Sequence, residues 1–189
     1  QVGNETNGNM LSPEGADLYP VDWVRQRAII NAGISAVRAA GNNSSIQPKV
    51  VVHVADPNNA DWWFAEATSS SQPVSDFDVI GLSFYPEWHS GSVSQTGNII
   101  ESLKNTYGKD VMLVEVAVPW TKDWNDNANN MLNSLPAGYG KPSPTGQKNW
   151  LIDITTEVSN RGGIGVIYWE PAWVSTGCTT EWGNGSSWD

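Results

Sequence analysis

The sequence predicts an α/β protein whose chain forms part of a (β/α)8 barrel, or TIM barrel. Short, β-branched and mostly apolar runs alternate with longer segments of helical spacing, which is the pattern of parallel strands joined by helices. The expected strands end in polar or aromatic residues, and the functional groups of such a barrel gather where its strands end. A doubly wound sheet would usually show a glycine-rich phosphate loop, which the sequence lacks.

Four runs are expected to form buried parallel strands, because they are short and rich in Val and Ile. Four other segments have helical spacing, and Gly41 is expected to close the first of these helices. That first helix carries Val24, Ala28, Ala32, Ala36 and Ala40 on one face. The expected strands are residues 49–56, 78–86, 110–119 and 164–171, and the expected helices are residues 21–40, 60–68, 96–107 and 145–159.

The number of strands indicates an incomplete barrel. If residues 1–4 are the tail of a strand, the sequence contains five strands, whereas the closed barrel has eight. We therefore expect residues 1–189 to be one partial barrel domain covering strands four to eight, about the last five βα units, with no second domain. An open five-stranded parallel sheet is the alternative.

The composition narrows the class of partner. The chain has 11 Trp against 3 Phe, and part of this excess is expected to stack on sugar rings as well as to pack the core. A net charge of -10 and a pI near 4.5 argue against nucleic acid or an anionic membrane as partner, since both require clustered Lys and Arg. No run approaches the roughly 18 apolar residues of a membrane span. The single cysteine offers no internal disulfide and no redox motif.

Two glutamates are candidates for acid and nucleophilic chemistry. Glu5 follows Asn4 at an expected strand end, and Glu115 lies inside the apolar run of residues 112–117. A carboxylate buried in such a strand costs several kcal/mol unless it is paired or used, and glycosidic bond cleavage requires two carboxyl groups that flank the bond. The alternative is that Glu115 forms a salt bridge with a buried Arg or Lys.

Four segments resemble, in order along the chain, the signature segments of the endo-β-1,4-galactanases, glycoside hydrolase family 53. They are Val2-Gly-Asn-Glu-Thr-Asn-Gly-Asn-Met-Leu, Gly81-Leu-Ser-Phe-Tyr-Pro-Glu-Trp-His, Val114-Glu-Val-Ala and Tyr168-Trp-Glu-Pro-Ala-Trp. The resemblance implies a retaining hydrolase of β-1,4-galactan, a side chain of pectin, with no cofactor for catalysis. It implies Glu5 as acid/base and Glu115 as nucleophile.

The same resemblance assigns binding roles around this pair. Asn4 would bind the sugar 2-hydroxyl, Tyr85 would hydrogen-bond the nucleophile, and Trp169 would form an apolar floor beneath the ring. His53 and His89 are candidates for sugar hydroxyls. For His53, which lies well inside its strand, a purely structural role is an equally good interpretation. His89 follows Trp88 in a loop, and we expect His89 and Trp88 to contact the substrate. Glu170 is expected to point to the opposite face from Trp169, because side chains alternate along a strand.

A loop after Glu115 carries alternating oxygen donors and is a candidate calcium site. The loop resembles a calcium motif of bacterial members of the family, which a Ser-x-x-Asp segment completes. Two of the loop residues depart from that motif. A polar, solvated loop is the alternative. The candidate ligands are Asp123, Asn125, Asn127, Asn129, Ser186 and Asp189.

The sequence is also compatible with two other functions. A β-mannanase or cellulase of the same clan would keep the same Asn and both Glu residues, and a non-catalytic glycan-binding protein would keep the aromatic cleft. We expect a monomeric protein that is secreted, periplasmic or at the cell surface, and that has a polysaccharide as partner and no nucleic acid.

Overall fold

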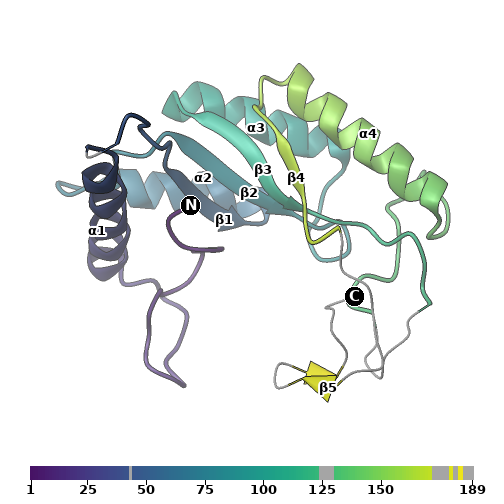
Figure 1. Ribbon diagram of the computed structural model, residues 1–189, viewed down its shortest axis with the longest axis horizontal. Coiled ribbons are helices and arrows are strands. Elements are labelled where there is room, and N and C mark those ends of the chain that lie inside the picture. Colours follow the sequence, from purple (N-terminus) through teal and green to yellow (C-terminus); the bar gives the residue numbers. More distant parts are fainter. Residues whose placement is uncertain (43, 124–129, 172–178, 181–182, 185–189) are drawn as a thin grey trace.

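The chain forms a four-stranded parallel sheet with helices packed along it (Figure 1). The computed structural model describes residues 1–42, 44–123, 130–171, 179–180 and 183–184. The elements are, in chain order, α1 (Trp23–Asn42), β1 (Val51–Ala55), α2 (Pro57–Thr68), β2 (Val79–Phe84), α3 (Val93–Tyr107), β3 (Asp110–Val116), α4 (Pro144–Asn160), β4 (Val166–Tyr168), β5 (Thr179–Thr180) and β6 (Gly183–Asn184). No helix in these ranges is long and apolar enough to cross a membrane.

The strands of the main sheet lie side by side in chain order, β1-β2-β3-β4, and all neighbours are parallel. In Figure 1, α2, α3 and α4 lie along one face of this sheet. A doubly wound sheet instead reverses its strand order and has helices on both faces. The winding is therefore that of consecutive βα units of a barrel, as the sequence predicts.

The first expected strand is reduced to one bridge. Val2 pairs in parallel with Val52 of β1, and the backbone N–H of Val2 donates to the carbonyl of Val51 at 2.9 Å. This bridge lies where the sequence predicts the tail of a strand, and the described residues form four strands of one parallel sheet together with this bridge. A separate antiparallel pair, β5 and β6, was not expected.

The helices begin where side chains cap them. Asp56 accepts a hydrogen bond from Asn58 N at the start of α2, whose first residue is Pro57, and Ser92 forms a capping box with Gln95 at the start of α3. Both helices start three residues earlier than predicted. Gly41 is not a cap but lies in the last turn of α1, where a Cβ would come within 2.7 Å of the Gln47 side chain.

The face of α1 that packs inward also differs from expectation. Val24, at the start of the stripe of small apolar residues, is 81% exposed, and the four alanines that follow it are exposed as well. The buried positions are Gln26, Ile30 and Ile34. The helix is confirmed, but its inward face is centred on a glutamine.

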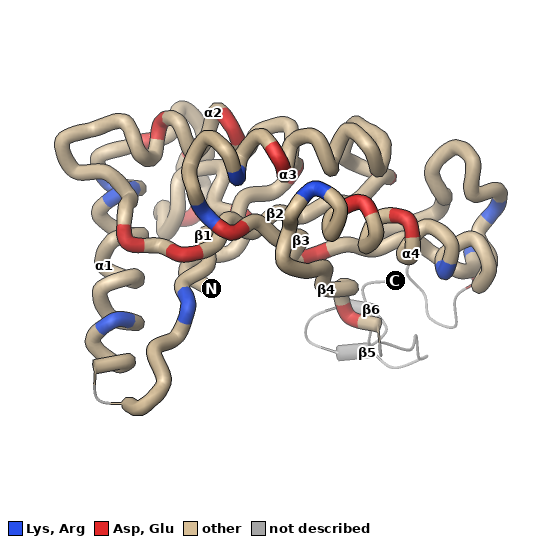
Figure 2. Tube along the Cα trace, turned by 90° about the horizontal axis from the view of Figure 1, so that it is seen from above, with Lys and Arg blue, Asp and Glu red and all other residues tan. Residues whose placement is uncertain are grey.

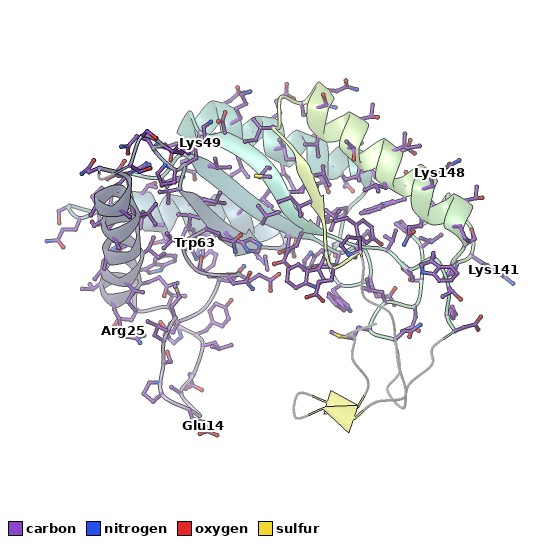
Figure 3. The ribbon with its side chains drawn as sticks, in the orientation of Figure 1. Glu14, Arg25, Lys49, Trp63, Lys141 and Lys148 are labelled. Atoms are coloured by element: carbon purple, nitrogen blue, oxygen red, sulfur yellow. The ribbon has the colours of Figure 1, made fainter. Side chains whose placement is uncertain are left out.

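The core lies between the sheet and the helices. Trp63 and Phe64 of α2, Ile80 of β2, Leu113 of β3 and Trp150 of α4 are all fully buried. Burial of each such side chain contributes about 1.5 to 3 kcal/mol. Trp63, labelled in Figure 3, also donates its indole N–H to the carbonyl of Thr6 at 2.7 Å, which ties the core to the N-terminal segment.

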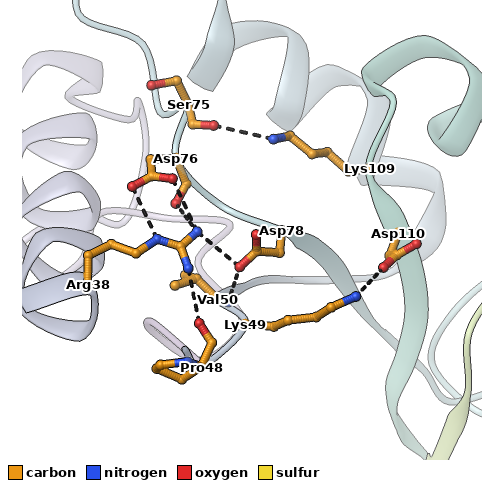
Figure 4. A network of polar contacts seen from close by, with 9 residues as sticks. All are labelled: Arg38, Pro48, Lys49, Val50, Ser75, Asp76, Asp78, Lys109 and Asp110. Atoms are coloured by element: carbon orange, nitrogen blue, oxygen red, sulfur yellow. Dashed lines mark hydrogen bonds and ion pairs between the residues drawn. The ribbon is translucent and has the colours of Figure 1, made fainter. Parts of the chain in front are cut away.

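Ion pairs connect residues at the end of the sheet where the strands begin (Figure 4). Arg38 of α1 contacts Asp76 at 3.1 Å and Asp78 at 3.0 Å, and Asp78 also accepts from the backbone N–H of Val50 at 2.6 Å. Lys49 contacts Asp110 at 2.7 Å. Figure 2 shows the Lys and Arg residues spread over separate elements, so the described residues form no basic surface of the kind that binds nucleic acid.

Candidate active site

The polar residues that end the strands converge at one edge of the sheet. β1, β2, β3 and β4 are parallel, so their carboxyl ends share an edge, and the bridge from Val2 to Val52 brings the N-terminal segment beside them. This arrangement unites residues that are up to 165 positions apart, from Asn4 to Trp169.

Glu5 is held in place through its neighbour Thr6. The backbone N–H and the hydroxyl of Thr6 both donate to the carbonyl of His53 at 2.9 Å. The carbonyl of Thr6 accepts from the Gln26 side chain at 2.9 Å and from the Trp63 indole. Glu5 itself has a φ of 45°, a left-handed conformation that non-glycine residues adopt mainly where surrounding contacts impose it.

Glu115 is placed by an irregularity between β2 and β3. The pairing shifts after Leu82–Leu113, so that Ser83 lies opposite Glu115. Such bulges often re-aim a side chain beside an active site. Val114 occupies the space beside Gly81, where a Cβ would approach within 3.1 Å of the Val114 side chain.

The two carboxylates lie close together. One side-chain ligand atom each of Glu5, His53 and Glu115 lies within 4.8 Å of the others. Glu115 is only 6% exposed, and the hydroxyl of Tyr85 donates to its Oε2 at 2.8 Å. Ser83 also hydrogen-bonds its side chain. Nδ1 of His53 lies 4.0 Å from Oε1 of Glu115. The neighbours of Glu115 are thus two hydroxyl groups and this imidazole, and the alternative of a salt bridge to Arg or Lys finds no support among the contacts of the described residues.

Burial dominates the electrostatics of Glu115. Burial raises the pKa of this carboxyl, and the nearby charges of Glu5 and Glu170 act in the same direction. The hydrogen bonds from Tyr85 and Ser83 oppose the shift because they stabilise the carboxylate. The pKa of Tyr85 is raised, mainly by burial and then by its bond to Glu115, so this hydroxyl keeps its proton and remains a donor.

His53 is completely buried, and both of its ring nitrogens have partners. Nε2 lies 2.6 Å from the Ser83 hydroxyl. Nδ1 lies 3.0 Å from the Gln1 amide nitrogen and 3.4 Å from the backbone nitrogen of Glu5. Burial lowers the pKa of His53 to about 4, so the ring is neutral at neutral pH. Neither nitrogen is left for a sugar hydroxyl in this arrangement, which favours the structural interpretation of His53.

Two exposed aromatic rings follow the ends of β2 and β4. Trp88 is 50% exposed, with its ring centroid 5.0 Å from that of Tyr85, and Trp169 is 43% exposed. His89 is half-buried and packs its ring edge-on against Tyr85 at 5.9 Å. Its Nδ1 accepts from the backbone N–H of Tyr85 at 3.1 Å. Asn4 is exposed, and its Oδ1 accepts from Gln1 at 3.2 Å.

Glu170, expected to point to the opposite face from Trp169, lies close enough to the site for its charge to act there. Its charge acts on both Tyr85 and Glu115, raising the pKa of each. β4 ends at Tyr168 and Glu170 has a φ of 44°, so the regular alternation assumed for this residue stops before it. Ser83 was missed altogether, because a serine inside an apolar strand gives no signal of its own in the sequence.

The candidate calcium ligands fall mostly outside the described residues. Asp123 is described and exposed, and its backbone N–H donates to the Thr121 hydroxyl at 3.1 Å. Asn125, Asn127, Asn129, Ser186 and Asp189 lie outside the described ranges.

Comparison with known proteins agrees with this geometry. A profile described as Glycosyl hydrolase family 53 matches residues 1–189. The chain is 46% identical to the arabinogalactan endo-β-1,4-galactanase of Cellvibrio japonicus, covering 100% of this chain and 50% of the relative. It is 33% identical to the endo-β-1,4-galactanase of Bacillus subtilis, covering 96% and 40%. The chain therefore spans about half the length of the curated relatives it matches.

Solved structures show the same relationship. The chain superposes on the Ignisphaera aggregans GH53 catalytic domain with a TM-score of 0.77 at 29% identity, covering 99% of this chain and 51% of the other. A structure from a study of two fungal β-1,4-galactanases gives a TM-score of 0.70 at 26% identity, covering 90% and 51%.

Proposed function

This chain belongs to glycosyl hydrolase family 53, and we propose that the full-length protein is an endo-acting hydrolase of β-1,4-galactan, a side chain of pectin, that works with retention. The observation that carries this proposal is the close approach of Glu5 and Glu115, whose side-chain oxygens lie within 4.8 Å. Retaining enzymes have carboxyl groups about 5 to 5.5 Å apart, whereas inverting enzymes need about 6.5 to 9.5 Å to admit a water molecule.

Each step of a double displacement has a suitable residue. The carboxylate of Glu115 would attack the anomeric carbon and form a covalent glycosyl ester, while Glu5 gives its proton to the departing glycosidic oxygen. Glu5, now ionised, would remove a proton from water, whose oxygen then displaces Glu115 and restores both groups. Tyr85 is placed to hold the attacking carboxylate through its 2.8 Å hydrogen bond. These steps use two carboxyl groups and water, and they need no metal ion or redox cofactor.

The aromatic residues support a carbohydrate as the substrate. The exposed rings of Trp88, which contacts Tyr85, and of Trp169, whose backbone pairs with Val116, offer flat apolar faces, and such faces stack on sugar rings. Asn4 is proposed to bind the sugar 2-hydroxyl, and His89 to contact a neighbouring sugar. The choice of galactan is supported by the names of the relatives from C. japonicus and B. subtilis.

The test is the release of reducing sugar by the full-length protein from debranched galactan, with mannan and cellulose in parallel. We expect release from galactan alone and its loss in Glu115→Gln. Release from mannan or cellulose would keep the mechanism and overturn the substrate. Binding to galactan without release by the wild-type protein would favour a glycan-binding protein instead.

We further propose that a calcium ion links two loops of the full-length protein. Asp123, Asn125, Asn127, Asn129, Ser186 and Asp189 supply oxygen ligands of the kind that calcium prefers. The ion would stabilise these loops and take no part in the chemistry. We expect the Tm of the full-length protein to fall when calcium is removed by a chelator and to recover with calcium but not with magnesium. An unchanged Tm would contradict the proposal.

The proposed substrate also bears on where and in what state the protein acts. A polysaccharide is too large to cross a membrane unaided, so we propose that the protein is secreted, periplasmic or at the cell surface. Measuring galactan hydrolysis in separated cell fractions tests this. We propose a monomer, because both carboxylates come from one chain, and a concentration-dependent mass in solution would contradict it.

A further inference from the structure

The nucleophile Glu115 is connected to the backbone of Glu5 through two buried side chains that the mechanism above leaves unused. His53 and Ser83 are both completely buried, and they lie on neighbouring strands with His53 Nε2 2.6 Å from Ser83 Oγ. Ser83 in turn is the partner of Glu115 in the pairing of β2 with β3. The three side chains therefore form one continuous row along the sheet.

The direction of the hydrogen bonds in this row is determined by its first member. A backbone N–H can only donate, and the N–H of Glu5 points at Nδ1 of His53 at 3.4 Å. The amide nitrogen of Gln1, also a donor, lies 3.0 Å from the same atom. Nδ1 must therefore accept. A neutral imidazole has one N–H, and the pKa of His53 is about 4 because the ring is buried, so the proton sits on Nε2.

The remaining bonds follow from this assignment. With its proton on Nε2, His53 donates to Ser83 Oγ. The Ser83 hydroxyl, having accepted, directs its own hydrogen to the Glu115 side chain, with which it forms a hydrogen bond. Bonds in such a chain polarise one another, so a donor that is itself receiving a bond is a stronger donor.

We infer that Ser83 and His53 are positioning residues for the nucleophile, joined in a one-way hydrogen-bonded chain from the Glu5 backbone N–H through the imidazole and the serine hydroxyl to the Glu115 carboxylate. Tyr85 holds Oε2 of Glu115, and the chain through Ser83 gives the carboxylate a second donor. The chain also links the position of Glu5 to that of Glu115, because the imidazole bonds the Glu5 backbone directly and reaches Glu115 through Ser83. This inference rests on the proposed role of Glu115 as nucleophile.

The test removes the hydroxyl in Ser83→Ala in the full-length protein. Two quantities are measured: the pH profile of kcat/KM on an aryl β-1,4-galactobioside, and the rate of covalent trapping by a 2-deoxy-2-fluoro galactobiosyl fluoride. Loss of a hydrogen bond to a charged group predicts a fall in kcat/KM of about 10- to 100-fold. Trapping should slow similarly, and the acidic limb of the profile should move to higher pH, because the lost bond stabilised the carboxylate.

Matched variants separate this effect from damage to the fold. Thr96→Val removes a buried hydroxyl on α3 that is not part of this hydrogen-bonded chain, and it should leave both quantities unchanged. Ser83→Thr keeps the hydroxyl and should retain most of the activity. His53→Gln keeps an N–H that can reach Ser83 and should be milder than His53→Leu. If Ser83→Ala does not fold, Ser83→Cys, a weaker donor of nearly the same shape, replaces it and should show the same changes.

The outcomes distinguish the two proposals. If the wild-type protein neither hydrolyses galactan nor is trapped at Glu115, the proposed function fails. If the wild type is active and folded Ser83→Ala keeps its trapping rate and pH profile, the proposed function stands and the inference about the chain is overturned. Equal losses in His53→Gln and His53→Leu would overturn the role assigned to the imidazole.

Discussion

The buried imidazole of His53 should make the stability of the protein depend on pH. The pKa of His53 falls from 6.5 to about 4 in the folded chain because the ring is buried, and the charge of Glu5 only partly opposes this. Between these two values the unfolded chain binds a proton that the folded chain does not. The stabilisation is therefore fully present above pH 6.5 and is lost as the pH falls toward 4.

The size of the effect follows from the shift. A difference of about 2.5 pKa units corresponds to about 3.4 kcal/mol over the whole range, of which about 2 kcal/mol is lost between pH 7.5 and pH 5. The measurement is urea unfolding of the full-length protein at these two pH values, for the wild type and for His53→Asn. We expect the free energy of unfolding of the wild type to fall by about 2 kcal/mol more than that of the variant.

The comparison between wild type and variant isolates His53. His89 and the carboxylates titrate in both proteins, so their contributions cancel in the difference. His53→Gln serves if His53→Asn does not fold. An equal dependence on pH in wild type and variant would refute the reasoning, since it would mean that His53 is protonated in the folded protein as readily as in the unfolded chain.

Three further predictions concern single substitutions in the full-length protein. Tyr85→Phe removes the 2.8 Å bond to Glu115 and should lower kcat/KM about 10- to 100-fold, with the acidic limb of the pH profile moved to higher pH; an unmoved limb would contradict this. Glu115→Gln should abolish hydrolysis. It should also raise Tm at pH 7 and not at pH 4, because the pKa of Glu115 is raised in the folded protein and its ionisation therefore destabilises the fold as pH rises. Scanning calorimetry at both pH values checks this. Asp78→Asn weakens bonds to Arg38 and to a backbone N–H and should cost about 1 to 2 kcal/mol. Asp76→Asn, at a side chain 68% exposed, should cost less than about 0.5 kcal/mol, and equal losses in urea unfolding would contradict the difference.

The order of strands and helices was predictable because local patterns determine it. β-branched apolar runs and helical spacing identified all four strands of the main sheet and the four helices. The inward face of α1 was not predictable in this way, because Gln26 lies at its centre. Gln26 is buried since its side chain donates to the carbonyls of Thr6 and Gly8 at 2.9 and 3.0 Å, and those partners are distant in the sequence.

The residues of the site also differ in whether local sequence patterns identify them. Glu115 was identifiable because an acidic residue inside an apolar strand is costly unless it has a role. Ser83 was not, because its place beside Glu115 depends on the shift in pairing between β2 and β3. The left-handed backbone of Glu170 was not predictable either, because the prediction for this residue assumed a regular strand. Local sequence patterns do not encode a shift in pairing or a reversal of the backbone.

The different surroundings of the two glutamates are consistent with different roles. Glu115 is 6% exposed and bound by two hydroxyl groups, which suits a group that must stay in one position and react as a carboxylate. Glu5 is exposed on a left-handed turn, which suits a group that must give up a proton in one step and take one from water in the next. The hydrogen-bonded chain through His53 is attached to the backbone of Glu5, so it fixes the spacing of the pair and leaves the Glu5 carboxyl free to exchange its proton.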